Sequence, residues 1–412
     1  MTMNKKILYI NIDGFSYSYL TYLMQTDPEG PFAELRREGL LFSDLRSGLI
    51  SITNPMQSAI LCGAWSDQTH NFYQHYDWEL GCVVKHRRTC DAENIGTLLA
   101  QTGKTVVSVH QFMLEGRPCQ EGVQNCAYIQ CPQEKSNAFQ RLAVLKDLIL
   151  GKPVRSGEKT FVYKEFPDFV AVYIDDIDSL GHNNAYEHYP KRALFEERQR
   201  DIAERLTQIG EELVQVLRLC KETGLYEDLT ILVTTDHGMT PFWGQSSLPD
   251  LLERIRKAGI RADLPEERTR DTRVIALPYT IELSLYGPPD MTTGEKELLL
   301  QVCQDAPDVS RVFTKEEMQR DFGVDTRGPE YLISPKYGKH FYHRDIPEDT
   351  FGAGHDSFDE TSQHIFGMVL GGVIPRDRIY DDRAYVIDLL PTILKKTFDL
   401  TLNPRRNIVL EW

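Results

Sequence analysis

The sequence lacks any apolar run of the roughly 18–20 residues that a membrane-spanning helix needs, so we expect no membrane association. It also lacks an excess of basic residues: 46 Lys and Arg stand against 61 Asp and Glu, and the net charge is −15. This balance argues against a nucleic-acid polymer as a partner, because such binding needs a basic face. An anionic small molecule remains compatible with the composition, since bound divalent cations would reverse the local field.

Cysteines are few, and no two of the eight form a CxxC pair. Cys119, Cys126 and Cys131 cluster in the chain, which leaves a structural zinc site as an alternative. Reduced thiols in a cytoplasmic protein are the simpler interpretation, and the cytoplasm is the expected location. The short apolar run at the N-terminus ends at Asp13, so we interpret it as a core strand and not as a signal peptide.

The chain of 412 residues shows no internal repeat and no low-complexity linker. Strand-like and helix-like segments alternate, which predicts an α/β fold with a mostly parallel central sheet. Apolar residues at helical spacing predict one long amphipathic helix over 192–223. The expected strands are 6–12, 104–110, 168–174, 229–235 and 365–370.

Two stretches look like additions to this core. Residues 110–165 are rich in Cys, Gln, Gly and Lys, and we expect a loop-rich excursion over one side of the site. Residues 262–350 combine strand-like and helix-like patterns and predict a small inserted α/β cap subdomain. The catalytic core would then comprise residues 1–261 and 351–412.

Metal-ligand residue types follow the apolar runs one after another. Because ligands bind beyond the carboxyl ends of parallel strands, side chains at these positions are expected to converge. A mixture of carboxylate and imidazole is typical of zinc or manganese sites. A satisfied structural histidine would explain any one of these positions, but not all of them together. The candidates are Asp13, Asp178, His182, Asp236, His237 and, in a glycine-rich turn, His355.

Thr53 precedes Asn54, Pro55 and an apolar stretch, a pattern that predicts the start of a helix. The free N–H groups and the dipole of a helix start favour a bound phosphate. Taken alone, this pattern favours Thr53 as a helix cap and nothing more.

These motifs resemble the type I phosphodiesterase/nucleotide pyrophosphatase family of the alkaline phosphatase superfamily. That family has a threonine, a glycine ten residues later and then a turn with histidine, and Thr53, Gly63 and His70 keep this order. Further matches in the family's order are Asp13, DSLGH at 178–182, TDHGM at 235–239 and GAGHD at 352–356. The resemblance implies an alkaline phosphatase-like three-layer sandwich.

The resemblance also implies two sites for divalent metal ions, most simply Zn²⁺, with Mn²⁺ as the alternative. Asp178, His182 and His355 would form one site. Asp13, Asp236 and His237 would form the other, with the oxygen of Thr53 as an additional ligand. Two such ions support in-line displacement at phosphorus, and Thr53 would form a covalent phospho-threonine that water then hydrolyses.

The chain departs from the family pattern in the substrate region. An aromatic residue usually follows the nucleophile, but here Asn54 does, and His75 stands where the family places an asparagine that helps to hold a phosphate oxygen. Aromatic side chains near 71–78, such as Tyr76, could stack on a substrate or simply pack. Asn54, His75 and Tyr76 are therefore candidate substrate contacts. The basic run KHRR at 85–88 could bind a substrate anion, although a solvated loop is the default interpretation.

The predicted activity is that of a metal-dependent phosphodiesterase or nucleotide pyrophosphatase-like hydrolase acting on a small phosphate ester through Thr53. A phosphomonoesterase or a hydrolase of the carbon–phosphorus bond of a phosphonate could use the same site. A non-catalytic binding protein that retains the fold is a weaker alternative, because all expected ligand types are present. The pattern does not predict the oligomeric state.

Overall fold

The computed structural model describes residues 5–120, 122–130 and 136–412. Its centre is an eight-stranded sheet in the order β21-β2-β20-β11-β1-β10-β6-β7. The strands of this sheet, in the same order, are β21 Arg378–Tyr380, β2 Gly39–Phe42, β20 Gly367–Gly371, β11 Leu229–Thr234, β1 Lys6–Ile12, β10 Phe169–Ile174, β6 Val106–Val109 and β7 Cys126–Ile129.

The three central strands of this sheet run parallel to one another. Every residue of β1, β10 and β11 is buried, as expected for strands that are covered on both faces. β1 pairs in parallel with both neighbours, so that Asn11 lies opposite Tyr173 on one side and Thr234 on the other. The three strands therefore end flush, and the residues that follow them emerge at one edge. The predicted mostly parallel sheet is confirmed.

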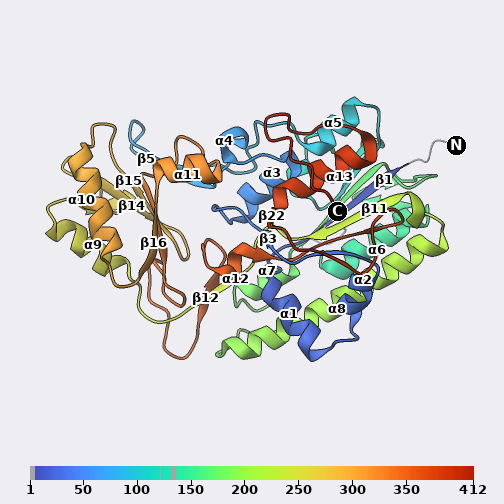
Figure 1. The fold of residues 1–412 in the computed structure, drawn as a ribbon, viewed down its shortest axis with the longest axis horizontal. Helices are drawn as coiled ribbons and strands as arrows, with labels where there is room; N and C mark the ends of the chain where they lie inside the picture. The colour runs from blue at the N-terminus through green and yellow to red at the C-terminus, as the bar shows by residue number, and fades with distance from the viewer. Residues whose placement is uncertain (1–4, 121, 131–135) are drawn as a thin grey trace.

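Helices cover both faces of the sheet and complete a three-layer sandwich (Figure 1). Alternation along β1 supplies both cores: Leu8 and Ile10 face one layer, and Ile7 and Tyr9 face the other. One layer holds α1 Tyr17–Thr26, α2 Pro31–Arg37, α6 Ala138–Ile149, α7 Asp176–Gly181 and α8 Phe195–Glu222. The other layer holds α3 Thr53–Cys62, α5 Ile95–Gln101 and α13 Leu389–Phe398. The predicted sandwich is confirmed, and α8 lies inside the expected helix.

A second sheet of five strands stands beside the first (Figure 1, left). Its strands, in spatial order, are β13 Ala262–Asp263, β14 Val274–Pro278, β15 Leu283–Tyr286, β17 Tyr331–Pro335 and β16 Val309–Thr314. Its helices are α9 Leu248–Lys257, α10 Thr293–Gln304 and α11 Lys315–Phe322. The sheet falls within the range predicted for the inserted cap, but α9 precedes that range and packs into the same apolar cluster. The cap boundaries stay a prediction.

Two local features differ from expectation. The segment 110–165 was expected to be loop-rich, yet it contributes β7 to the edge of the main sheet and α6 to a helix layer. The expected strand 365–370 begins later, at Gly367, because Ile365 belongs to β19 His364–Ile365. This strand, β20, pairs antiparallel with β11.

Short elements complete the described chain. These are the β-strands β3 Leu45–Arg46, β22 Ala384–Tyr385, β4 Gln74–Asp77, β5 Cys82–Lys85, β8 Val154–Ser156, β9 Lys159–Phe161, β12 Thr240–Phe242 and β18 Gly352–Gly354, and the helices α4 Ser66–Thr69 and α12 Glu360–Gln363. Single 3-10 turns lie at Phe112–Leu114, Tyr226–Asp228, Pro265–Glu267 and Val386–Asp388. Within the described ranges, none of the helices has the length and apolar character to cross a membrane.

Candidate active site at the carboxyl ends of the strands

The end of β1 and the start of α7 meet almost backbone to backbone. The N–H of Asp13 donates to the carbonyl of Ile174 at 2.8 Å, which continues the sheet pairing by one residue. Gly14 follows with φ +82°, and a Cβ at this position would lie 2.9 Å from Cα of Asp178. Because only glycine fits this approach, Gly14 allows Asp13 and Asp178 to face the same space.

The turn after β11 presents Asp236 and His237, both fully buried. The hydroxyl of Ser47 donates to the carbonyl of Asp236 at 2.6 Å, and the hydroxyl of Thr235 donates to the carbonyl of His237 at 3.0 Å. A Cβ on Gly238 would lie only 2.0 Å from the carbonyl oxygen of Thr361. Close packing against the Thr361 backbone thus explains the glycine after the two candidate ligands.

His355 arrives from a two-stranded ribbon in which β18 pairs with β12. Its Nδ1 donates to the carbonyl of Ser51 at 2.7 Å, and the hydroxyl of Ser51 donates back to the carbonyl of His355 at 2.5 Å. This reciprocal pair fixes the imidazole so that Nε2 faces the site. Ser51 lies two residues before Thr53 and was not predicted, because a lone serine carries no recognisable signal.

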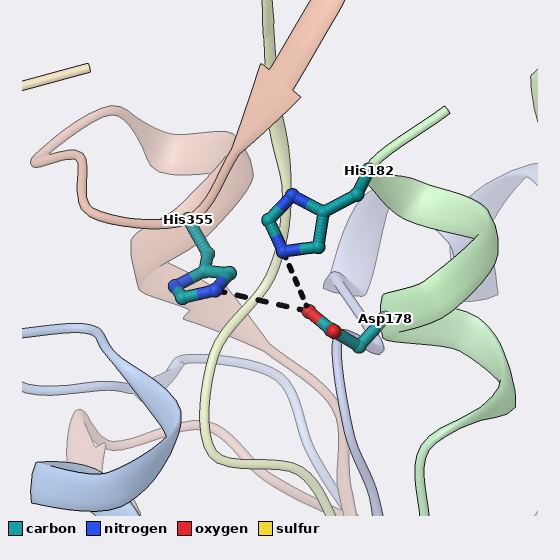
Figure 2. Close-up of side chains that lie close together, drawn as sticks. All are labelled: Asp178, His182 and His355. Atoms are coloured by element: carbon teal, nitrogen blue, oxygen red, sulfur yellow. Dashed lines mark ion pairs between the residues drawn. The ribbon is translucent and has the colours of Figure 1, made fainter. Parts of the chain in front are cut away.

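Asp178, His182 and His355 form the first group of candidate ligands, with their donor atoms within 4.8 Å of one another (Figure 2). Oδ1 of Asp178 lies 3.3 Å from Nε2 of His182 and 3.8 Å from Nε2 of His355. Nδ1 of His182 donates to the carbonyl of Ala353 at 3.0 Å, which turns Nε2 toward the group. The structure brings together the three residues predicted for one metal site.

The second group surrounds His237. Nε2 of His237 lies 3.2 Å from Oδ1 of Asp13 and 3.5 Å from Oδ2 of Asp236. Donor atoms of Asp13, His237 and Asp178 also lie within 4.8 Å of one another, so Asp178 belongs to both groups. The rings of His237 and His355 stack at 3.8 Å between centroids. The two predicted sets are therefore adjacent and form one continuous site.

Thr53 is the first residue of α3, and the cap position itself is occupied by Ile52. The Thr53 hydroxyl does not accept a hydrogen bond from the first turn of the helix as a cap would. Its Oγ1 lies 3.1 Å from Nε2 of His237 instead. The expected start of a helix is thus present, and the interpretation of Thr53 as a cap alone is wrong. Gly63 ends α3 in the left-handed conformation, with φ +59°.

Burial and like charge act together on the carboxylates of the site. Burial, followed by the charges of Asp236 and Asp178, raises the pKa of Asp13 well above its usual range. Burial also opposes the charge of Asp178, but His182 and His355 hold the pKa of Asp178 well below its usual range. Burial would lower the pKa of His182, yet its pair with Asp178 raises that pKa to about 9.

Three buried carboxylate oxygens lack a hydrogen-bond donor among the described residues: Oδ1 of Asp13, Oδ1 of Asp178 and Oδ2 of Asp236. A buried acceptor without a hydrogen-bond partner is costly and therefore rare in native structures. Three of them in one place indicate that something else binds there. The other oxygen of Asp13 accepts from the hydroxyl of Tyr173, another residue that was not predicted. The three oxygens and the facing imidazole nitrogens fit a site for divalent cations.

The residues predicted to contact substrate are placed differently. Tyr76 is 3% exposed and packs with apolar residues of the second sheet, while its hydroxyl accepts from Arg268 at 2.7 Å. His75 is buried, and its Nδ1 lies 2.9 Å from Nε2 of His86. Both side chains have packing partners away from the two groups of ligands. Asn54 follows Thr53 and stays half-buried at the start of α3.

The basic run at 85–88 does not act as a unit, since His86 is buried and Arg88 pairs with Glu115. Of the three clustered cysteines, Cys119 is buried and Cys126 is half-buried, and both are free thiols. Cys131 lies outside the described residues, so the alternative of a zinc site there stays untested.

The three-layer α/β sandwich carries these Asp and His side chains near the carboxyl ends of its central strands. The chain belongs to the type I phosphodiesterase / nucleotide pyrophosphatase family, whose family model matches residues 7–356. It is therefore a phosphoric ester hydrolase of a metal-dependent family.

Solved structures show the same fold over nearly the whole chain. Murine ectonucleotide pyrophosphatase/phosphodiesterase 5 has a TM-score of 0.66 at 15% identity, covering 97% of this chain and 96% of that one. The human protein has a TM-score of 0.65 at 16% identity, with the same coverage. A further murine structure with the same scores is described as inactive, has a threonine replaced by alanine and contains AMP. No curated protein matches the sequence.

Proposed function

We propose that the protein hydrolyses a phosphodiester or diphosphate bond of a small molecule with Thr53 as the nucleophile. The observation that carries this proposal is the position of Thr53 Oγ1, 3.1 Å from Nε2 of His237 at the start of α3. A hydroxyl placed beside two adjoining groups of metal-ligand side chains is poised to attack a phosphorus atom held by the same groups.

We propose two divalent cations, zinc or manganese, as cofactors. Asp178, His182 and His355 would hold one, and Asp13, Asp236 and His237, with Thr53, would hold the other. The three carboxylate oxygens without a hydrogen-bond donor support this assignment. When bound, such ions lower the pKa of an adjacent hydroxyl and neutralise charge that develops on the phosphoryl group.

The proposed reaction has two steps at Thr53. Oγ1 of Thr53 forms a bond to phosphorus while the bond from phosphorus to the leaving-group oxygen breaks, and the phosphoryl group stays on the threonine. Thr53 is the first residue of α3, and the dipole of a helix favours phosphate charge at its N-terminus. A water molecule then attacks phosphorus, the bond to Oγ1 breaks, and Thr53 recovers its hydroxyl.

One solved structure with a similar fold supports this proposal. The murine protein with AMP carries an alanine in place of a threonine and is described as inactive. An inactive threonine variant that still holds a nucleoside monophosphate agrees with a nucleophilic threonine and a nucleotide-like substrate.

Substitution of Thr53 provides the test. We expect Thr53→Ala to reduce hydrolysis of bis(4-nitrophenyl) phosphate on the order of 10³-fold or more while the bound metal is retained, since removal of a nucleophile has losses of this size. Thr53→Ser should keep part of the activity. Thr21→Ala, an exposed change on α1, is the matched control.

Two outcomes would overturn the proposal or part of it. Full activity of Thr53→Ala would remove the nucleophile assignment. Faster turnover of 4-nitrophenyl phosphate or phosphonoacetate than of the diester would replace the proposed substrate class by a monoester or a phosphonate.

We keep the cytoplasm as the proposed location, which the seven free thiols of the described chain support.

A further inference from the structure

A cavity of about 700 Å³ adjoins the candidate active site on the side of His182. Part of its lining comes from His182 after α7, from Lys191 in the loop before α8, and from Phe242 in β12. Another part of the lining comes from the segment that follows the last strand of the second sheet and includes Tyr342 and Arg344. Thr53 does not line the cavity, so a molecule in it would reach the site from the side of the first ligand group.

Two cations face this cavity without an acidic partner. Neither Lys191 nor Arg344 forms an ion pair with any described residue; the Arg344 guanidinium donates to the hydroxyl of Tyr342 at 3.1 Å and lies 5.2 Å from the centre of its ring. One carboxylate, Asp345, lines the same wall, and its Oδ1 accepts from the N–H of Ser246 at 2.9 Å. In a chain with a net charge of −15, two cations without an acidic partner among the described residues thus line one cavity beside the candidate site.

The backbone on both sides of Lys191 is held by buried side chains. Asn183 accepts from the N–H of Arg192 at 3.0 Å and donates to its carbonyl at 3.0 Å. The fully buried guanidinium of Arg198 donates to the carbonyl of Pro190 at 2.7 Å. Lys191 thus stands on a loop whose flanking peptide groups are fixed, so only its side chain is free to adjust.

The backbone around Arg344 is fixed in the same way. The N–H of Tyr342 donates to Nδ1 of His340 at 3.2 Å, and the N–H of Ile346 donates to the carbonyl of Gly244 at 2.9 Å. The hydroxyl of Thr350 donates to the carbonyl of Arg192 at 3.4 Å, which joins this loop to the one that carries Lys191. The two cations are therefore held on adjoining loops that line one cavity.

We infer that this cavity is the leaving-group subsite, and that Lys191 and Arg344 select substrates whose leaving group carries its own anionic group, a carboxylate or a phosphate. This inference rests on the proposed function. Thr53 Oγ1 lies beside His237 of the second ligand group, and in-line displacement expels the leaving group on the face opposite Oγ1. The cavity adjoins His182 of the first group, where that face would open. Phe242 and Tyr342 offer walls for a ring or sugar between the scissile bond and the charge.

A matched pair of chromogenic esters tests the inference on the metal-loaded, full-length enzyme. Both are phenyl phosphodiesters; one releases 4-nitrophenol and the other releases 3-carboxy-4-nitrophenol, so only the charge of the leaving group differs. We expect the wild type to prefer the carboxylated ester. Lys191→Ala and Arg344→Ala should each reduce that preference about twofold to fivefold through KM, the upper part of the range for an exposed charge pair.

Internal controls separate recognition from damage to the fold. Hydrolysis of the ester with the uncharged leaving group should be unchanged in both variants, and Lys191→Arg should restore the preference that Lys191→Ala loses. Arg270→Ala removes a cation whose side chain is 94% exposed and which does not line the cavity, so it should change neither ester. A third ester with a phosphonate in place of the carboxylate shows which of the two anionic groups is preferred.

Two contrary results are distinguishable. Hydrolysis of both esters with equal efficiency, or a preference that survives the loss of both cations, would overturn the inference and leave the proposed function standing. Absence of hydrolysis of every diester by the metal-loaded enzyme would overturn the proposed function and, with it, this inference.

Discussion

Asp178 is the residue on which both ligand groups depend. Its carboxylate lies 3.3 Å from His182, and its donor atoms are also within 4.8 Å of those of Asp13 and His237. Replacement of this side chain should therefore affect both cations, whereas replacement of a ligand that belongs to one group should affect only one.

We expect Asp178→Asn to lower the metal content of the purified protein well below that of His182→Ala, which should still retain about one of the two proposed ions. Metal analysis after dialysis against dilute chelator checks the difference. Asp349→Asn, an exposed change outside both groups, is the control. Equal metal loss in Asp178→Asn and His182→Ala would contradict the shared position of Asp178.

Glu282 is a second residue whose protonation has consequences. It is 2% exposed, and burial, followed by the charge of Asp356, raises the pKa of Glu282 to about 8. Its Oε1 accepts from the N–H of Phe358 at 2.9 Å. Since the folded state binds the proton more tightly than the unfolded state, stability falls as the pH rises from the ordinary pKa of glutamate toward 8.

Glu282→Gln keeps the acceptor oxygen and removes this penalty. We expect little change in the free energy of unfolding near pH 4.5 and a gain on the order of 4 kcal/mol near pH 8, because the pKa rises from 4.5 to about 8 and each pKa unit is worth about 1.4 kcal/mol. Guanidinium unfolding at both pH values, with chelator present throughout so that metal occupancy is constant, measures the difference. A gain of equal size at both pH values would show that Glu282 is charged throughout.

At the scale of the elements, helix α3 is anchored by a buried chain of amides. Nε2 of Gln57 donates to Oδ1 of Asn11 on β1 at 2.8 Å, and Nε2 of Gln111 donates to Oε1 of Gln57 at 2.8 Å. All three side chains are fully buried. Gln57 lies one turn after Thr53, so these bonds fix the rotation of the helix that presents the hydroxyl.

We expect Gln57→Leu to lower kcat for the diester about 10-fold to 100-fold, with a smaller change in KM, because a slight rotation of α3 misplaces the nucleophile. Gln57→Glu should be worse than Gln57→Leu, since it adds a buried charge. Gln301→Leu, an exposed glutamine on α10, should leave both constants unchanged. If Gln57→Leu changes only KM, the chain of amides has no role in placing Thr53.

The elements also show what the sequence could predict. β1, β10 and β11 were recognisable because continuous apolar runs ended in Asp or His, and parallel strands bring such ends to one edge. Local patterns did not show how the hairpin of β4 and β5 packs. Tyr76 packs against Ile275, Leu277 and Tyr286, which are some two hundred residues away in the chain. No local pattern reports such a contact, and the aromatic segment therefore looked like a candidate for substrate stacking.

Contacts made by backbone groups were equally hidden. The bond between His355 and the carbonyl of Ser51 involves a serine in an ordinary polar stretch, and the hydroxyl of Tyr173 reaches Asp13 from a strand that reads as core. The antiparallel direction of β20 also has no local signature, because a buried apolar strand has the same composition in either direction.

At the scale of the whole molecule, Asp325 links the second sheet to the core. Its Oδ2 lies 2.6 Å from Nδ1 of His70, and it makes a two-pronged pair with Arg327 at 2.8 and 2.9 Å. Burial opposes its charge, but Arg327 and His70 hold the pKa of Asp325 well below its usual range. The contribution of this carboxylate to stability is therefore present at neutral pH and is lost only in strong acid.

We expect Asp325→Ala to destabilise the protein by about 1–3 kcal/mol at pH 7, since it breaks a buried carboxylate network whose partner Arg327 is half-exposed. Limited proteolysis should cut 262–350 faster in this variant. Asp321→Ala removes an exposed carboxylate of α11 and should change neither result. Unchanged stability and unchanged cleavage in Asp325→Ala would show that other contacts hold the second sheet in place.

The most direct test of a two-metal threonine hydrolase is the metal content of the purified protein, measured together with hydrolysis of bis(4-nitrophenyl) phosphate and 4-nitrophenyl phosphate before and after chelation. We predict about two zinc or manganese ions per chain and a preference for the diester, with activity that chelation abolishes and added metal restores. Diester hydrolysis by the metal-free protein at the full rate would contradict the proposal.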